Sequence, residues 1–343
     1  MPGIVAAGLL WVWLAGSPQL RAAEESQYRV GVAQLDITPD YPVRLSGFGF
    51  RRTESVGVTQ KIWTKALALQ TGRGDIAVLV TTDNLGVPAT VVNEVAARLG
   101  QKAGLKRERF TVTATHTHTA PMLRGVAPTL FSVPIPPEHQ SHIDRYTRDL
   151  TDKIEQVSLA AIKDLAPGRL SWGIGSVKFA INRRTPGGPV DHDLPTLVVK
   201  NLDGQVRAIY VNYACHCVTL SDNQISGDWA GFAQELIQRE FPHAIALISV
   251  GCGADSNPSS GPTGNKVAIA EAQGLEIAAE VKRLTNGFLA PLEGELTTRL
   301  QSVTLDFAPP PSREEFMNRV KKGGYIGYHA QVQLSRLDRG EAL

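Results

Sequence analysis

Residues 244–250 read Ala-Ile-Ala-Leu-Ile-Ser-Val, and this apolar run of strand length decides the class of fold. A run without polar alternation is typical of a strand buried on both faces, and residues 76–82 have the same character. Stretches with helical periodicity flank the first run at 230–240 and 268–286. Buried strands between helices predict an α/β fold in which helices cover a sheet.

The other predicted elements follow from the same two periodicities. Helices are expected over 89–103, 143–165 and 313–321, and strands over 28–33, 65–70, 110–115, 170–174, 197–201, 208–214 and 295–304. Asp203-Gly204 separates two strand runs and is a hairpin signal. Because some strands are joined by helices and others by a hairpin, the sequence predicts a mixed sheet with covering helices in one large domain.

Composition excludes some classes of partner. The 343 residues are 43% hydrophobic and 20% charged, which is ordinary for a globular protein, and the formal net charge is only +2. The basic residues are scattered and form no patch with interleaved aromatics, so no nucleic-acid partner is expected. The three cysteines, Cys215, Cys217 and Cys252, are too few for a disulfide framework and lack the paired spacing of a structural zinc site. They are expected to be small buried residues.

The two ends of the chain differ from its body. Residues 3–16 are apolar but too short to cross a bilayer comfortably, and Ala22 and Ala23 follow, so 1–23 are predicted to be a signal peptide for export to the periplasm or beyond the cell. A membrane anchor would need a longer apolar run. The proline-rich residues 308–312 read as a linker. The predicted organisation is therefore a catalytic body over 24–307 and a separate tail over 308–343.

The motif Thr115-His116-Thr117-His118-Thr119-Ala120-Pro121 directly follows a predicted strand. In an extended chain alternate side chains point to one face, so His116 and His118 are expected side by side. Two imidazoles at the end of a strand suit a divalent metal, or a metal and a proton shuttle. Two hydrogen-bonded histidines in a polar loop are the alternative.

A third histidine, His216, ends another apolar strand, with Cys215 and Cys217 expected on the opposite face. It could bind a metal, or it could be a satisfied core residue. Asp228 opens the next helix and is a candidate cap or a candidate hydrogen-bond acceptor behind a metal ligand.

Two further positions are candidates for catalysis. Ser256 lies in the glycine-rich turn 251–258 after a buried strand, where it could be a nucleophile, an oxyanion donor or part of an anion nest. An ordinary polar loop is the alternative. Arg183 stands at a strand end, where it could orient a carbonyl or carboxylate, or form a surface ion pair.

Taken together and in their order along the chain, these motifs and the segments around them resemble those of the neutral, non-lysosomal ceramidase family. The resemblance is carried by the first strand and turn at 31–39, the glycine loop at 46–49 with Arg51, and the Thr-His-Thr-His segment, which is the most specific. Asn182-Arg183, the strand ending at His216 and the loop at 253–258 follow in the family's order. The similarity runs over about 28–308, nearly all of the predicted mature chain.

The resemblance implies hydrolysis of the amide bond of ceramide (N-acylsphingosine) or a related N-acyl lipid, supported by a single Zn²⁺. It assigns His116 and His216 as zinc ligands and His118 as an acid/base or substrate-orienting neighbour. Arg183 becomes a polar clamp on the substrate, and Ser256 becomes the nucleophile or a transition-state donor. A lipid substrate also implies contact with a membrane surface. The alternatives are a hydrolase of another amide or ester on the same scaffold, and a binding protein without catalysis.

The resemblance further implies that a glutamate and a tyrosine complete the zinc site from segments after Leu343. The chain by itself is therefore expected to bind zinc weakly and to be inactive. His116 and His216 are expected to converge on one point, with Ser256 in the same pocket. Asp83, Asp228 and Asp255 are candidates for contacts behind the ligands, with Asp83 the first to test as a third ligand.

Overall fold

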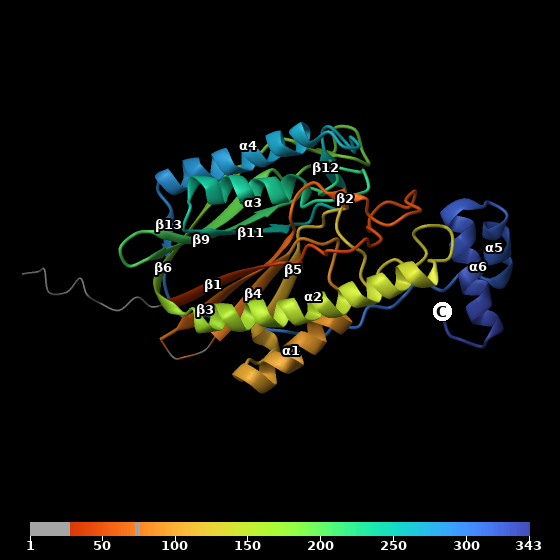
Figure 1. Ribbon diagram of the computed structural model, residues 1–343, viewed down its shortest axis with the longest axis horizontal. Helices are drawn as coiled ribbons and strands as arrows, with labels where there is room; N and C mark the ends of the chain where they lie inside the picture. The colour runs from red at the N-terminus through yellow and green to blue at the C-terminus, as the bar shows by residue number, and fades with distance from the viewer. Residues whose placement is uncertain (1–27, 73, 75) are drawn as a thin grey trace, which may run out of the picture.

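A mixed sheet of nine strands organises the described part of the chain, which is residues 28–343 except 73 and 75 of a computed structural model (Figure 1). The predicted signal peptide at 1–23 lies outside the described residues. The main strands are β1 (Tyr28–Asp36), β3 (Trp63–Thr71), β4 (Ile76–Thr82), β5 (Phe110–Ala114), β6 (Ala166–Ser176), β8 (Asp193–Asn201), β9 (Val206–Tyr213) and β11 (Ile245–Val250). Their order is β11-β9-β8-β6-β1-β3-β4-β5, with β13 (Ala290–Leu292) pairing with β6. Only β11 with β9 and β4 with β5 run parallel in this sheet, which confirms the predicted mixed α/β fold.

The sheet folds over so that its two halves face each other. One buried apolar cluster contains Val30 and Leu67 from β1 and β3 together with Val199 and Leu247 from β8 and β11. The ammonium of Lys65 on β3 reaches across this interior and donates to the carbonyl of Ala246 on β11 at 2.8 Å. β11 and β3 lie five places apart in the strand order, so this contact requires the sheet to fold on itself.

Helices cover the outer face of each half and complete four layers (Figure 1). The helices α1 (Ala89–Ala103) and α2 (Pro137–Lys163) pack on the half that contains β3, β4 and β5. On the other half lie α3 (Asp228–Glu240) and α4 (Val267–Asn286). The helix α2 packs on the sheet through one apolar stripe. The residues of this stripe recur at helical spacing and are all buried: Ile143, Tyr146, Leu150, Ile154 and Val157.

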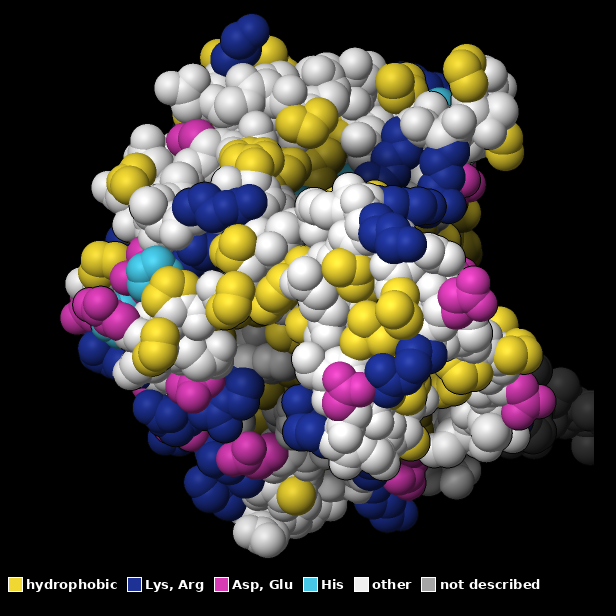
Figure 2. Space-filling model, turned by 90° about the vertical axis from the view of Figure 1, so that its right-hand side faces the viewer, with side chains coloured by type: hydrophobic (Ala, Val, Ile, Leu, Met, Phe, Trp, Pro, Cys, Tyr) yellow, Lys and Arg dark blue, Asp and Glu magenta, His cyan; other side chains and the backbone are white. Residues whose placement is uncertain are grey.

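Small elements complete the description. A 3₁₀ turn spans Arg107–Arg109. Two short sheets lie outside the main one: β2 (Gly57–Val58) pairs with β10 (Gln224–Ile225), and β7 (Ala180–Asn182) pairs with β12 (Ser256–Pro258). The last helices are α5 (Arg313–Val320) and α6 (Gly324–Asp338). At the end of the molecule that carries α5 and α6, basic side chains are interspersed with acidic and apolar ones (Figure 2). Within the described residues, no helix combines the length and the apolar character that crossing a bilayer requires.

Two expectations for the C-terminal part are wrong. The described residues 293–312 contain no strand, although one was predicted at 295–304. The alternating Val303, Leu305 and Phe307 that suggested it are 68%, 80% and 97% exposed, because no neighbouring strand covers them. The helix α6 was not predicted, since Gly324 and Gly327 weaken its helical pattern. It forms because Phe316 of α5 and Ala330 of α6 are buried where the two helices meet.

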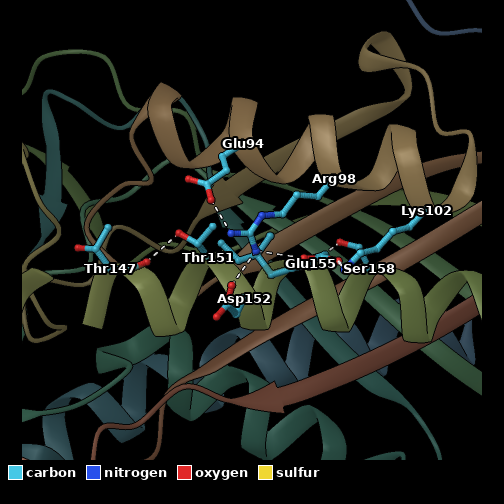
Figure 3. Close-up of polar contacts among 9 residues, drawn as sticks. Glu94, Arg98, Lys102, Thr147, Thr151, Asp152, Glu155 and Ser158 are labelled. Atoms are coloured by element: carbon cyan, nitrogen blue, oxygen red, sulfur yellow. Dashed lines mark hydrogen bonds and ion pairs between the residues drawn. The ribbon is translucent and has the colours of Figure 1, made fainter. Parts of the chain in front are cut away.

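A cluster of charges holds α1 against α2. The Glu155 carboxylate of α2 is 7% exposed and pairs with Lys102 and, at 3.1 Å, with Arg98 of α1 (Figure 3). Arg98 also pairs with Asp152 at 2.6 Å. Burial alone would raise the pKa of Glu155, but the hydrogen bonds from Lys102 and Arg98 outweigh it, so this pKa lies below the usual glutamate value.

The substitution Glu155→Gln tests this cluster, because it removes the charge and keeps the shape. A depressed folded-state pKa contributes stability above the unfolded pKa of about 4.3 and loses it as the pH falls through the folded value. We expect Glu155→Gln to lower the free energy of unfolding by about 1 kcal/mol at pH 7, with the difference lost as the pH falls through the depressed folded-state pKa of Glu155. Urea unfolding at pH 7 and over a series of acidic pH values measures this difference. The exposed Glu271→Gln is the matched control, and a loss that persists unchanged in acid would contradict the electrostatic explanation.

Candidate metal centre

The two histidines of the motif leave the sheet through a strained turn. After β5, the amide of Thr115 still bonds to the Thr82 carbonyl of β4 at 3.0 Å. His116 then adopts φ 58°, a left-handed conformation that costs a non-glycine residue roughly 1–2 kcal/mol. The segment is therefore not extended as predicted. The turn places Thr117 in a bridge with Cys217, and the amide of His118 bonds to the Cys217 carbonyl at 3.1 Å, beside the segment that follows β9.

Three imidazoles meet at this point. His116, His118 and His216 each offer a nitrogen, and these three atoms lie within 4.8 Å of one another. The Nε2 atoms of His116 and His118 are 3.3 Å apart, and the ring centroids of His116 and His216 are 4.7 Å apart. The convergence predicted for His116 and His216 is confirmed in its geometry, and His118 joins them as a third nitrogen donor.

Backbone carbonyls fix the tautomers of two of these rings. The Nδ1 of His116 lies 2.7 Å from the Leu85 carbonyl, and the Nδ1 of His216 lies 2.7 Å from the Gly253 carbonyl. A carbonyl can only accept, so each Nδ1 carries the proton and each Nε2 presents a lone pair. This outer hydrogen bond is the usual arrangement behind a metal-binding histidine.

Burial keeps the cluster neutral. It lowers the pKa of His116 and of His216, and the positive charge of Arg183 lowers both further. Burial, together with the neighbouring imidazoles, lowers the pKa of His118 to about 3. Neutral imidazoles are the form that binds a metal, and two Nε2 atoms at 3.3 Å repel each other unless a proton or cation lies between them. Three histidines are a known zinc donor set, so the residues fit the ion that the family resemblance implies, and all three could hold it.

His118 is held differently from the other two rings. Its buried Nδ1 makes no hydrogen bond by distance and angle among the described residues, although the backbone of Gly47 lies close enough to offset part of the effect of burial on the pKa of His118. Gly47, at φ 88°, backs the ring so closely that a Cβ there would lie 2.5 Å from the His118 Cγ. The buried guanidinium of Arg51 donates to the His118 carbonyl at 2.6 Å and to the Ser46 carbonyl at 2.5 Å, which ties the glycine loop to the histidine segment.

The start of α3 supports His216 from behind. The indole Nε1 of Trp229 donates to the His216 carbonyl at 2.9 Å. The buried carboxylate of Asp228, the first residue of α3, accepts from the amides of Trp229 and Leu220 at 2.6 and 2.8 Å. Asp228 therefore braces the helix start and the chain after His216, but among the described hydrogen bonds its carboxylate accepts from no histidine ring.

Arg183 lies at the rim of the cluster. Its Nε and Nη2 donate to the Ala254 carbonyl at 3.0 and 2.7 Å, and its backbone amide bonds to the Asp255 carbonyl at 2.7 Å. The side chain is exposed, and its charge is close enough to lower the pKa of two of the histidines. The arginine forms no ion pair among those found in the described residues.

Ser256 reaches the site with its backbone rather than its hydroxyl. Its carbonyl accepts from the His216 amide at 2.9 Å. Its side chain is 4% exposed, and the hydroxyl lies beside the buried Cys215 thiol, without a hydrogen-bond partner by distance and angle among the described residues. Burial raises the pKa of Cys215, and the Ser256 hydroxyl partly offsets that effect.

Three other residues named from the sequence, Asp83, Asp255 and Cys252, are not part of the histidine cluster. Asp83 is buried and accepts from the amide of Trp63 and the side chain of Gln234, both at 2.9 Å, so its carboxylate is not part of the histidine group. Asp255 accepts from the side chain of Asn182 at 3.3 Å. Cys252 is exposed, contrary to the expectation that all three cysteines are buried.

The supporting residues Arg51, Gly47 and Trp229 were not singled out for a role at the site. The sequence signal for Gly47 and Arg51 was the glycine loop, but nothing local to that loop indicates that it closes on His118.

Comparisons with known proteins agree with this fold. The solved structure described as "Ceramidase complexed with C2" superposes with a TM-score of 0.69 at 21% identity, covering 79% of this chain and 46% of that one. The neutral ceramidase from Pseudomonas aeruginosa gives a TM-score of 0.70 at 21% identity, covering 79% and 47%. The chain thus spans about half the length of these structures, whose likeness shows the fold, and no curated protein matches the sequence. The family model described as "Neutral/alkaline non-lysosomal ceramidase, N-terminal" matches residues 28–250, so the chain belongs to the neutral/alkaline non-lysosomal ceramidase family.

Proposed function

We propose that this protein is a zinc-dependent hydrolase of the amide bond of ceramide or a related N-acyl lipid, releasing a fatty acid and an amine. The observation that carries the proposal is the convergence of three neutral imidazoles at one end of the folded sheet in a member of the ceramidase family. His116 and His216 would hold the ion through Nε2, since both have Nδ1 fixed by a carbonyl. Bound zinc supplies Lewis-acid polarisation of the amide carbonyl.

The remaining side chains would orient the substrate. The Nδ1 of His118 is not fixed by a hydrogen bond of regular distance and angle as it is in the two ligands, and the low pKa produced by its burial keeps the ring neutral, so we assign His118 to hydrogen bonding with the substrate beside the ion. Phe48 packs edge-on against the His118 ring, with centroids 5.1 Å apart, and limits its rotation. Arg183, anchored on one edge by the Ala254 carbonyl, would clamp a polar group of the substrate with its other N–H groups.

Metal titration tests the ligand assignment. We expect the chain to bind one Co²⁺ or Zn²⁺, followed by the visible absorption of cobalt and by zinc competition. His116→Ala and His216→Ala should each weaken binding by more than the roughly 10–100-fold that loss of an outer hydrogen-bond partner costs. His118→Ala should stay within that range and instead weaken the binding of a short-chain N-acylsphingosine to the metal-loaded chain.

The exposed His243→Ala is the matched histidine control for this titration. Equal losses in all three cluster variants would make His118 a third ligand. Undiminished affinity in both His116→Ala and His216→Ala would overturn the zinc assignment. A chain that binds the ion but hydrolyses only other amides or esters would support the alternative hydrolase function.

The proposed role of Arg183 as a clamp predicts a separate effect on substrate binding. Arg183→Ala should weaken the binding of the N-acyl substrate roughly tenfold or more, because a hydrogen bond to a charged group is lost, while cobalt affinity stays near that of the unaltered chain. Calorimetry with the substrate, beside the same metal titration, measures both affinities. The neighbouring exposed Arg184→Ala serves as the control. An effect of Arg184→Ala as large as that of Arg183→Ala would mean that only the general positive charge matters.

A further inference from the structure

An apolar cavity of about 690 Å³ lies at the end of the molecule that carries α6. Three segments distant in sequence line it: the glycine loop with Phe50 directly after it, the loop before α2 with Leu130, and the first turns of α6 with Tyr325 (Figure 1). Of the described residues that line the cavity, none is Asp, Glu, Lys or Arg. Its volume is that of a small-molecule site.

Contacts outside the cavity hold two of its walls together. A Cβ at Gly49 would lie 2.6 Å from the Leu130 carbonyl oxygen, so the glycine loop and the loop before α2 touch directly. Phe131 is fully buried, and the Arg44 guanidinium lies 3.9 Å from the centroid of its ring. Arg44 also donates to the Arg51 carbonyl at 2.9 Å, beside the glycine loop. These two walls are therefore formed before any ligand binds.

The aromatic side chains of the cavity are open to a ligand. Phe50 is 63% exposed and Tyr325 is 68% exposed, although both line the cavity. Apolar surface left exposed in this way marks a binding site. A stable protein partner needs about 800 Å² of surface on each side, whereas a cavity between three segments suits one narrow apolar ligand. A single hydrocarbon chain has that shape and chemistry.

Stacked aromatic rings connect the cavity with the histidine cluster. Phe50 stacks on Phe48 with ring centroids 5.3 Å apart. Phe48 in turn lies edge-on to the ring of His118, with centroids 5.1 Å apart. Two ring contacts therefore lead from an imidazole of the metal centre to the wall of the cavity. An apolar chain that starts at the cluster can follow these rings.

We propose that this cavity binds the acyl chain of the N-acyl lipid, with the amide at the histidine cluster and the chain running over Phe48 and Phe50 to Tyr325. This inference rests on the proposed function and adds a chain-binding site to it. The acyl chain is the hydrocarbon part common to every substrate that the proposed function allows. Tyr325 lies outside residues 28–250 that match the family model, so α6 supplies a wall that family membership does not assign.

A series of ligands with one headgroup tests the chain site: N-hexanoyl-, N-octanoyl- and N-decanoylethanolamine. Calorimetry measures their binding to the metal-free full chain, so hydrolysis is not needed for the readout. We expect the affinity to rise roughly fourfold with each added methylene, which is the factor that burying one methylene provides. Phe50→Ala and Tyr325→Ala should each weaken binding of the decanoyl compound roughly tenfold and that of the hexanoyl compound about twofold or less, because only the longer chain reaches both rings.

Two controls complete the design. Phe288 is 88% exposed and does not line the cavity, so Phe288→Ala is the matched aromatic control, and thermal melts confirm that each variant is folded. The direction of the chain is read in the cobalt-loaded protein by proton NMR of the bound ligand. Paramagnetic broadening falls with distance from the ion, so the protons next to the amide should broaden more than those of the terminal methyl.

Three outcomes would overturn the proposal: an affinity that does not depend on chain length, a loss in Phe288→Ala equal to that in Phe50→Ala and Tyr325→Ala, or stronger broadening of the terminal methyl. A chain-length dependence that requires Phe50 and Tyr325, in a zinc-loaded chain that releases no fatty acid, would support this inference and count against the proposed hydrolase alone. Fatty-acid release in a chain whose affinity ignores acyl length would do the reverse.

Discussion

The packing of the two halves of the sheet against each other is the constraint on which the histidine cluster depends. β5 and β9 belong to different halves, and in a flat sheet of this order they would be far apart. Apolar side chains from both halves fill the space between them, and Lys65 bridges that space to Ala246. Only in the folded sheet do the segments after β5 and β9 run side by side, as the Thr117–Cys217 bridge shows.

The histidine cluster combines unfavourable features that the contacts around it stabilise. His116 occupies a left-handed conformation, and three imidazoles are buried close together. Backbone carbonyls hold the tautomers of His116 and His216, and Arg51 and Trp229 hold the chain carbonyls next to the rings. Such strain persists where tertiary contacts over-determine a site. The donors are thereby pre-positioned, which lowers the ordering that binding a metal requires.

Family membership and site geometry bear on different questions. The proposed class of chemistry follows from the family, whereas the solved structures that resemble this chain are only 21% identical and show its fold but not the orientation of each side chain. The hydroxyl of Ser256 lies beside the buried thiol of Cys215, and the backbone carbonyl of Ser256 accepts from the His216 amide. The resemblance had placed Ser256 at the substrate.

The sequence alone determined the elements and the donor types, because periodicity and apolar runs are local properties. β4 has the predicted bounds, β11 and α1 to α4 differ by a few residues at most except at the start of α2, and the Thr-His-Thr-His motif identified the site. Tertiary structure alone decided the rest. The fold-over of the sheet, the meeting of His216 with the His116–His118 pair and the Arg51 anchor join segments distant in sequence. The face on which Ser256 lies depends on the register of β12 with β7. A shift of that register by one residue would move every side chain to the opposite face, and no local sequence pattern fixes it.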